Sequence, residues 1–189
     1  MEILESINQR VKIRRIWQMP NKWTFQMPAV AELVYRYVGD GKGWIDPFAG
    51  ETSPAEITND MNEGRKAKFH LDAFDFPSVL ERDDYEGCLF DPPYSLEQIS
   101  RSYEEVGRKS KLGYSTNGAE DPTGNWRKLK DALGRKIKSG GIVICFGWNS
   151  SGFGKKRGFE IIEILLLAHG GAHNDTIITV ERKFQSSLF

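Results

Sequence analysis

The sequence predicts an α/β fold built on one open sheet that is mostly parallel and ends in an antiparallel hairpin. Apolar segments of strand length alternate with amphipathic segments of helical length along most of the chain. The run 141–147 (GIVICFG) is almost wholly apolar, which is typical of a parallel strand buried on both faces. Near the end, 159–169 and 174–184 flank the turn HGGAH, which predicts the hairpin. The 189 residues suffice for one core, so we expect 1–189 to form a single domain.

The remaining elements follow from periodicity and turn residues. Residues 28–38 carry apolar positions at helical spacing, and Pro28 suits the first turn of a helix. Strands are expected at 43–48, 55–60, 67–74 and 85–91, with a brief helix at 76–82. Helical patterns follow at 95–109, where Ser95 can cap the N-terminus, and at 125–141, expected to end at glycine. The polar residues 110–124 between them predict a long loop.

Three acidic residues end predicted strands or follow them directly. Asp46, Asp60 and Asp91 each stand at such a point. Because ligands of open α/β sheets bind beyond the carboxyl ends of the strands, we expect these three side chains to line one edge.

Charge is unevenly distributed in a chain whose net charge is zero. Residues 101–158 hold 13 Lys+Arg against 5 Asp+Glu, and the run 10–22 holds five cations and no acid. A solvated face explains either stretch as well as a phosphate-binding surface does. We interpret the basic insertion at about 95–138 as a nucleic-acid contact region.

Cysteine and histidine usage argues against a metal site and against disulfides. Cys88 and Cys145 lie in apolar runs, which indicates buried reduced thiols. There are three histidines and no Cys-x-x-Cys pair, so no metal is expected. His169 and His173 flank a Gly-Gly turn and suit a hairpin better than catalysis. Without a signal peptide or a membrane-length apolar run, we expect a cytoplasmic protein with no membrane partner.

The stretch CLFDPPYS (88–95) combines groups that can hold a flat ring bearing an amine. A carboxylate at Asp91 can accept a hydrogen bond from an exocyclic NH₂. Pro92 and Pro93 fix the following backbone and remove its N–H donors, which leaves carbonyl acceptors. Tyr94 can stack on the ring. An ordinary strand followed by a Pro-Pro turn is the alternative for these four letters alone.

DPPY after an apolar strand resembles the catalytic motif of the S-adenosylmethionine-dependent DNA amino-methyltransferases, chiefly the N6-adenine type. WIDPFAG (44–50) resembles the family's cofactor motif, and TFQMP (24–28) its N-terminal segment that folds over the cofactor. HLDAFDF (70–76) stands where the family places an acid near the cofactor's adenine. The order, cofactor motif before catalytic motif, matches the subclass without a recognition domain between them. The resemblance implies a class I methyltransferase Rossmann-like sheet and one catalytic domain.

The resemblance also implies a role for each matching residue. The cofactor is S-adenosylmethionine, which leaves as S-adenosylhomocysteine, and the partner is DNA. Gly50 would let the backbone approach the cofactor's methionine end, and Asp46 would orient the turn or the cofactor's ammonium. The remaining assignments are Pro47, Phe48 and Ala49 beside that turn, Asp60 on the ribose, Asp72 and Ala73 at the adenine, Phe25 and Met27 in the cover, and Asp91, Pro92, Pro93 and Tyr94 on the target base.

The sequence departs from the family after Gly50. ETSP leads almost directly into AEITND, so the first crossover helix is shortened or lost, and the ribose role of Asp60 is open. Without a recognition domain, target choice would fall to 95–138, to a loop at 147–158, or to a second subunit or separate specificity partner. In that loop Trp148 could stack on a base, Asn149 could bond one, and Lys155, Lys156 and Arg157 could bind phosphates.

Three other substrates or states remain open from the sequence. RNA methyltransferases acting on a guanine or adenine amine also carry DPPY, although the TFQMP segment favours DNA. N4-cytosine enzymes more often have serine in place of Asp91. A catalytically inactive nucleic-acid-binding relative is the non-enzymatic alternative.

Overall fold

The computed structural model describes residues 10–108, 126–171 and 173–184. In these ranges one sheet of seven strands has the order β1-β6-β7-β5-β4-β2-β3. Strand β7 runs antiparallel to β5 and β6, and the other neighbouring pairs are parallel. The predicted mostly parallel sheet with a C-terminal antiparallel hairpin is therefore confirmed. The strands are β1 (Lys12–Trp17), β2 (Trp44–Asp46), β3 (Ile57–Thr58), β4 (Tyr85–Phe90), β5 (Ile137–Gly147), β6 (Phe159–Ala168) and β7 (Thr176–Lys183).

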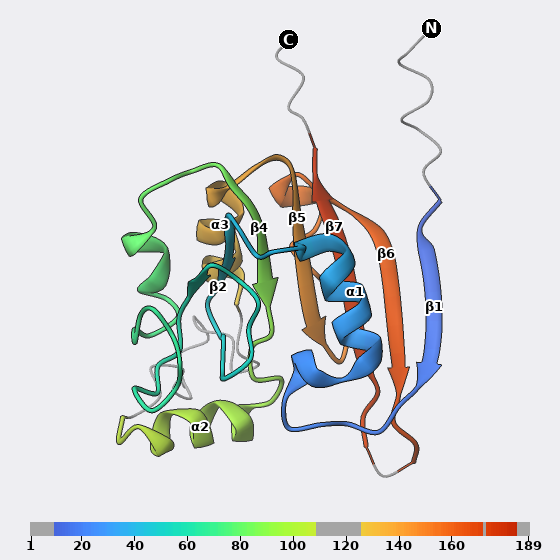
Figure 1. Ribbon diagram of the computed structural model, residues 1–189, viewed down its shortest axis with the longest axis horizontal. Helices are drawn as coiled ribbons and strands as arrows, with labels where there is room; N and C mark the ends of the chain where they lie inside the picture. The colour runs from blue at the N-terminus through green and yellow to red at the C-terminus, as the bar shows by residue number, and fades with distance from the viewer. Residues whose placement is uncertain (1–9, 109–125, 172, 185–189) are drawn as a thin grey trace, which may run out of the picture.

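Helices cover both faces of the sheet, and one helix lies beyond the end to which the parallel strands point (Figure 1). α1 (Pro28–Val38) lies on one face and α3 (Arg127–Lys136) on the other, while α2 (Leu96–Glu105) lies by the edge to which the strands point. Short 3₁₀ turns stand at η2 (Thr24–Gln26), η3 (Phe76–Val79) and η4 (Lys155–Arg157). Ser95 caps α2 as expected, because its hydroxyl accepts a hydrogen bond from the Gln98 N–H at 3.2 Å. None of the helices in the described ranges is long and apolar enough to cross a membrane.

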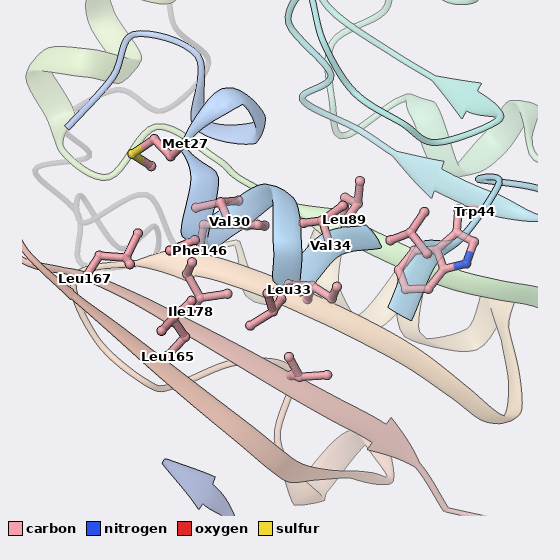
Figure 2. Packing of buried hydrophobic residues seen from close by; sticks show 14 residues of the cluster. Met27, Val30, Leu33, Val34, Trp44, Leu89, Phe146, Leu165, Leu167 and Ile178 are labelled. Atoms are coloured by element: carbon pink, nitrogen blue, oxygen red, sulfur yellow. The ribbon is translucent and has the colours of Figure 1, made fainter. Parts of the chain in front are cut away.

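Strand β5 explains why the core has two halves. Its side chains alternate, so Ile144 and Phe146 pack under α1 while Val143 and Cys145 pack under α3. Figure 2 shows the first half, where α1 places Val30, Leu33 and Val34 at helical spacing against side chains of β4 to β7. Leu33 and Val30 have no exposed surface. This two-sided burial fixes the strand ends that carry the site.

One predicted strand is absent, one predicted helix ends earlier than expected, and one strand was not predicted. Residues 67–74 form no strand: a single bridge joins Phe69 to Asn59, and the Asn59 amide holds the backbone of Leu71 through both its oxygen and its nitrogen. The helix predicted for 125–141 ends at Lys136, because Ile137 already turns into extended backbone and begins β5. Strand β1 lies in the basic run 10–22, whose charges hide its alternation. The predicted loop 110–124 lies outside the described residues.

The carboxyl ends of the parallel strands meet at one edge of the sheet (Figure 1). Asp46 is the last residue of β2, Asp91 follows β4, and Asp60 lies two residues beyond β3. All three residues therefore lie at the end of the sheet where the parallel strands finish, as predicted. Between β2 and β3 there is no helix, so the first crossover is indeed reduced to a turn.

Candidate active site

The DPPY turn lies between two cavities at this edge. Pro92, Pro93 and Tyr94 line both of them, one of about 390 Å³ and one of about 460 Å³. Asp91 lines the first cavity. Strand β4 delivers the turn from the core, since Cys88, Leu89 and Phe90 are all buried. The DPPY turn thus separates the two cavities, and its backbone carbonyl acceptors are held in place by the two prolines.

The Tyr94 hydroxyl donates a hydrogen bond to the Asp91 carboxylate. Burial raises the pKa of Asp91, and hydrogen bonding from Tyr94, with a smaller effect from Thr24, opposes the rise. The Tyr94 ring meets Trp148 edge to face, with centroids 5.7 Å apart. Asp91 is therefore an oriented acceptor, and the Tyr94 ring is held against a second aromatic side chain.

One wall of the first cavity joins the turn after β2 to the segment after β3. Gly50 and Asp60 both line it, and the Gly50 N–H donates to Asp60 Oδ2 at 3.0 Å. The Asn62 N–H donates to Asp60 Oδ1 at 2.8 Å. Gly50 has φ 56°, a conformation that favours glycine, and a Cβ there would meet nothing within 4 Å. The wall therefore combines open space at Gly50 with a carboxylate fixed by two backbone donors.

Asp46 orients the turn and does not line the cavity. Its Oδ1 accepts from the Phe48 N–H at 2.8 Å, and its Oδ2 accepts from the Ser53 hydroxyl at 2.6 Å. Both hydrogen bonds lie within the turn after β2, so the Asp46 carboxylate stabilises this turn. Pro47 and Phe48 line the cavity, whereas Ala49 is buried and donates its N–H to the Asn59 carbonyl at 2.9 Å.

The predicted adenine segment contributes two residues to the first cavity. Leu71 and Ala73 line it, while the Asp72 carboxylate is buried. Asp72 accepts from the Tyr103 hydroxyl at 2.8 Å and from the Phe74 N–H at 3.1 Å. Asp72 therefore joins this segment to α2, and Tyr103 itself lines the cavity.

The predicted cover segment reaches the cavity through its first residue. Thr24 lines the cavity beside Trp23, whereas the side chains of Phe25 and Met27 pack into the core under α1. The Phe25 ring meets Phe146 with centroids 5.7 Å apart. Phe25 and Met27 therefore anchor the segment in the core, and Thr24 is exposed to the cavity that Asp91 also lines.

The second cavity contains residues of the loop after β5. Trp148 and Asn149 line it, and Trp148 is 41% exposed. Arg157 also lines it, but its guanidinium bonds to Asp131 Oδ1 and to the Phe153 carbonyl, both at 2.6 Å. Arg157 therefore holds the loop together. Lys155 and Lys156 are exposed in η4, outside both cavities.

Several solved structures of similar shape are methyltransferases, whereas no protein-family model and no curated protein matches the sequence. A 1,6-didemethyltoxoflavin-N1-methyltransferase from Burkholderia thailandensis, solved with S-adenosylhomocysteine, has a TM-score of 0.53 and 9% identity over 84% of this chain and 78% of that chain. TrmN from Thermus thermophilus has a TM-score of 0.50 and 16% identity over 84% of this chain. This chain has the class I methyltransferase fold. It matches 49% of the TrmN chain, about half its length.

Three aromatic residues at the site were not predicted from sequence. Trp126 lines both cavities just before α3, and its ring stacks on Phe74 with centroids 5.5 Å apart and an interplanar angle of 21°. Trp23 and Tyr103 line the first cavity. Only Trp23 had a signal, its position beside TFQMP. Of the basic insertion 95–138, residues 109–125 lie outside the described ranges.

Proposed function

We propose that this chain transfers a methyl group from S-adenosylmethionine to the exocyclic amine of a nucleobase, N6 of adenine in DNA. The observation that carries the proposal is the DPPY turn between two cavities, where the Tyr94 hydroxyl orients the Asp91 carboxylate. One cavity is available for a cofactor and the adjoining one for a flipped base. The fold and the motif order support the same assignment.

The groups that line the first cavity suit S-adenosylmethionine. The Asp60 carboxylate, held by the Gly50 and Asn62 N–H groups, suits a pair of ribose hydroxyls. The open space at Gly50 leaves room for a ligand against the backbone. Ala73 and Phe48 supply apolar walls for a flat ring. When bound, S-adenosylmethionine supplies an electrophilic methyl group.

The chain's own residues would act on the amine. The Asp91 carboxylate and the Pro92 carbonyl would each accept a hydrogen bond from one of the two N–H groups of the amine. These hydrogen bonds favour a tetrahedral nitrogen whose lone pair is aimed at the methyl group. Tyr94 would stack on the base, a contact worth roughly 1–3 kcal/mol elsewhere. The nitrogen becomes acidic only once it carries the methyl group, and its proton then passes to solvent. Asp91 is therefore needed as an acceptor more than as a strong base.

A labelling experiment tests the proposal. The protein is incubated with methyl-labelled S-adenosylmethionine and unmodified DNA or RNA, and the product is hydrolysed to nucleosides. We expect label in N6-methyladenine from DNA and at least a 100-fold loss in Asp91→Ala, by analogy with the loss of a positioned catalytic group. Asp91→Ala should still bind the cofactor in calorimetry, and Glu160→Ala, an exposed change on β6, should retain activity.

The outcomes distinguish amine methylation in general from methylation of adenine in DNA. Label only in RNA, or only in guanine or cytosine, would remove DNA adenine as the target and keep amine methylation. RNA is the principal alternative, since similar motifs occur in enzymes that methylate RNA amines. A wild-type chain that binds no S-adenosylmethionine is no methyltransferase.

A further inference from the structure

A third cavity, of about 380 Å³, opens at the same edge of the sheet. One wall is the segment that leaves β1, with Pro20 and Asn21, and another is the turn between β6 and β7, with His173 and Asn174. Both segments lie at the lower edge in Figure 1. Tyr94 lines this cavity as well as the two at the DPPY turn. A ligand here would therefore be adjacent to whatever occupies the active site.

His169 makes this cavity a defined structure. Its side chain is buried, with Nδ1 2.5 Å from the Gln18 carbonyl oxygen and Nε2 2.9 Å from the Thr176 hydroxyl. Its backbone N–H donates to Asp175 Oδ1 at 3.0 Å. These bonds join the segment after β1 to the β6–β7 turn, although about 150 residues separate them in sequence. The two walls are thus held at a fixed separation.

The groups that face this cavity suit a nucleotide. Trp148 lines it and is 41% exposed, so a base can stack there beside Tyr94. The side chains of His173 and Asn174 make no hydrogen bond to any residue of the described ranges, which leaves their polar atoms for a ligand. An asparagine amide offers a donor and an acceptor, the pair that reads a base edge.

The run 10–22 extends this surface with the composition of a nucleic-acid contact. Trp17 is 65% exposed and Met19 is 52% exposed at the end of β1. Arg15 and Lys22 are exposed on either side of them. Aromatic and cationic groups in alternation bind single-stranded nucleic acid by stacking and by phosphate attraction. Arg14 in the same run pairs with Glu163, so the exposed Arg15 and Lys22 are cations available to a nucleic acid.

We propose that the third cavity binds the nucleotide next to the target base, so that Asn174 and His173 influence which sequences are methylated. The inference rests on the proposed function, because it takes the substrate strand to enter at Tyr94. It assigns flanking-base recognition to the β6–β7 turn and the segment after β1. The loop 147–158 then serves both cavities through Trp148.

The test uses oligonucleotides randomised on both sides of one target base. The double variant His173→Ala and Asn174→Ala should raise the KM for the oligonucleotide about tenfold and flatten the wild-type preference at one flanking position. Affinity for S-adenosylmethionine and kcat at saturation should change less than twofold, because neither side chain lines the cofactor cavity. Glu160→Ala, exposed at the start of β6, is the matched control and should behave as wild type.

Each result decides one question. If wild type methylates nucleic acid and the double variant has the same KM and flanking preference, the third cavity is not a nucleotide site and the inference fails alone. If wild type methylates neither DNA nor RNA, the proposed function fails and takes the inference with it. A kcat loss with unchanged KM would assign the turn to catalysis or folding and would also overturn flanking-base recognition.

Discussion

Asp46 is the residue whose chemistry depends most on where the chain places it. Its carboxyl group has no exposed surface, and burial raises its pKa to about 7, with Asp91 and Asp60 adding to the rise. Hydrogen bonds from Ser53 and from the Phe48 N–H oppose it. The sequence predicted that Asp46 orders the DPFAG turn or binds an ammonium group, and could not choose, because burial depends on neighbours distant in sequence.

This burial makes stability depend on pH through Asp46. Between the ordinary pKa of 3.8 and about 7, the folded chain keeps a proton that the unfolded chain has lost, so stability falls as pH rises through that window. We expect Asp46→Asn, which cannot ionise, to gain stability relative to wild type between pH 4 and pH 8, by roughly 2–4 kcal/mol. Urea unfolding at several pH values measures it, with Asp84→Asn as an exposed control. A pH-independent difference would contradict the assignment.

Sequence motifs point to some of the residues that line the first cavity and miss others that tertiary packing brings there. Asp91 and Gly50 lie in contiguous motifs, and both line the first cavity. Trp126 comes from outside any motif and reaches the cavities through aromatic contacts with Phe48 and Phe74. Side chains brought in by tertiary packing leave no local pattern.

At the scale of elements, the sequence predicted most helices and strands, and it failed where side chains or charges replace the expected pattern. The helix at Pro28–Val38 has the predicted bounds, because its apolar spacing is strong and Gly39 ends it with a positive φ. The stretch 67–74 has strand-like composition, yet the Asn59 side chain takes the backbone bonds that a strand partner would supply. Strand β1 is an edge strand with exposed charges, so its alternation is weak.

The loop between β5 and β6 gives a test at this scale. Glu181 of β7 is buried and accepts hydrogen bonds from the N–H groups of Phe153 and Gly154, at 2.5 and 2.8 Å. A Cβ at Gly152 would lie 2.1 Å from Glu181 Oε2. We therefore expect Gly152→Ala to displace the carboxylate and to lower the free energy of unfolding by roughly 1–3 kcal/mol.

The matched control for Gly152→Ala is Gly171→Ala. A Cβ at Gly171 meets nothing within 4 Å, and its φ is not positive, so thermal unfolding should barely change. Because Gly152 lies in the loop that carries Trp148, the Gly152→Ala variant should also bind nucleic acid more weakly. Equal stability of the two variants would show that Glu181 moves aside without cost.

At the scale of the whole molecule, one buried carboxylate joins the first strand to the last third of the chain. Glu163 of β6 is 1% exposed and lies beside Arg36 and Tyr37 of α1 and Arg14 of β1. The sequence predicts β6 and α1 separately, but it does not say that β1 pairs beside β6. Pairing across such a separation depends on charge and burial that only the assembled sheet brings together.

Removing the Glu163 charge should weaken the attachment of the edge strand β1 to the rest of the sheet. The Arg36 Nη1 and the Tyr37 hydroxyl both lie 2.8 Å from Glu163 Oε2. Burial raises the pKa of Glu163, but these hydrogen bonds and the charges of Arg36 and Lys12 together lower it below its ordinary value. Glu163→Gln leaves the cations without their partner, so we expect a loss of roughly 1–3 kcal/mol at pH 7. Because the folded pKa is lowered, wild type should lose this advantage as pH falls below about 4.5.

The control is Glu32→Gln, because the Glu32 side chain is 61% exposed and also pairs with Arg14. This substitution should cost less than about 0.5 kcal/mol in urea titrations at the same pH values. Equal losses in the two variants would mean that Glu163 contributes no more than a surface ion pair, and that β1 is held by its backbone hydrogen bonds to β6.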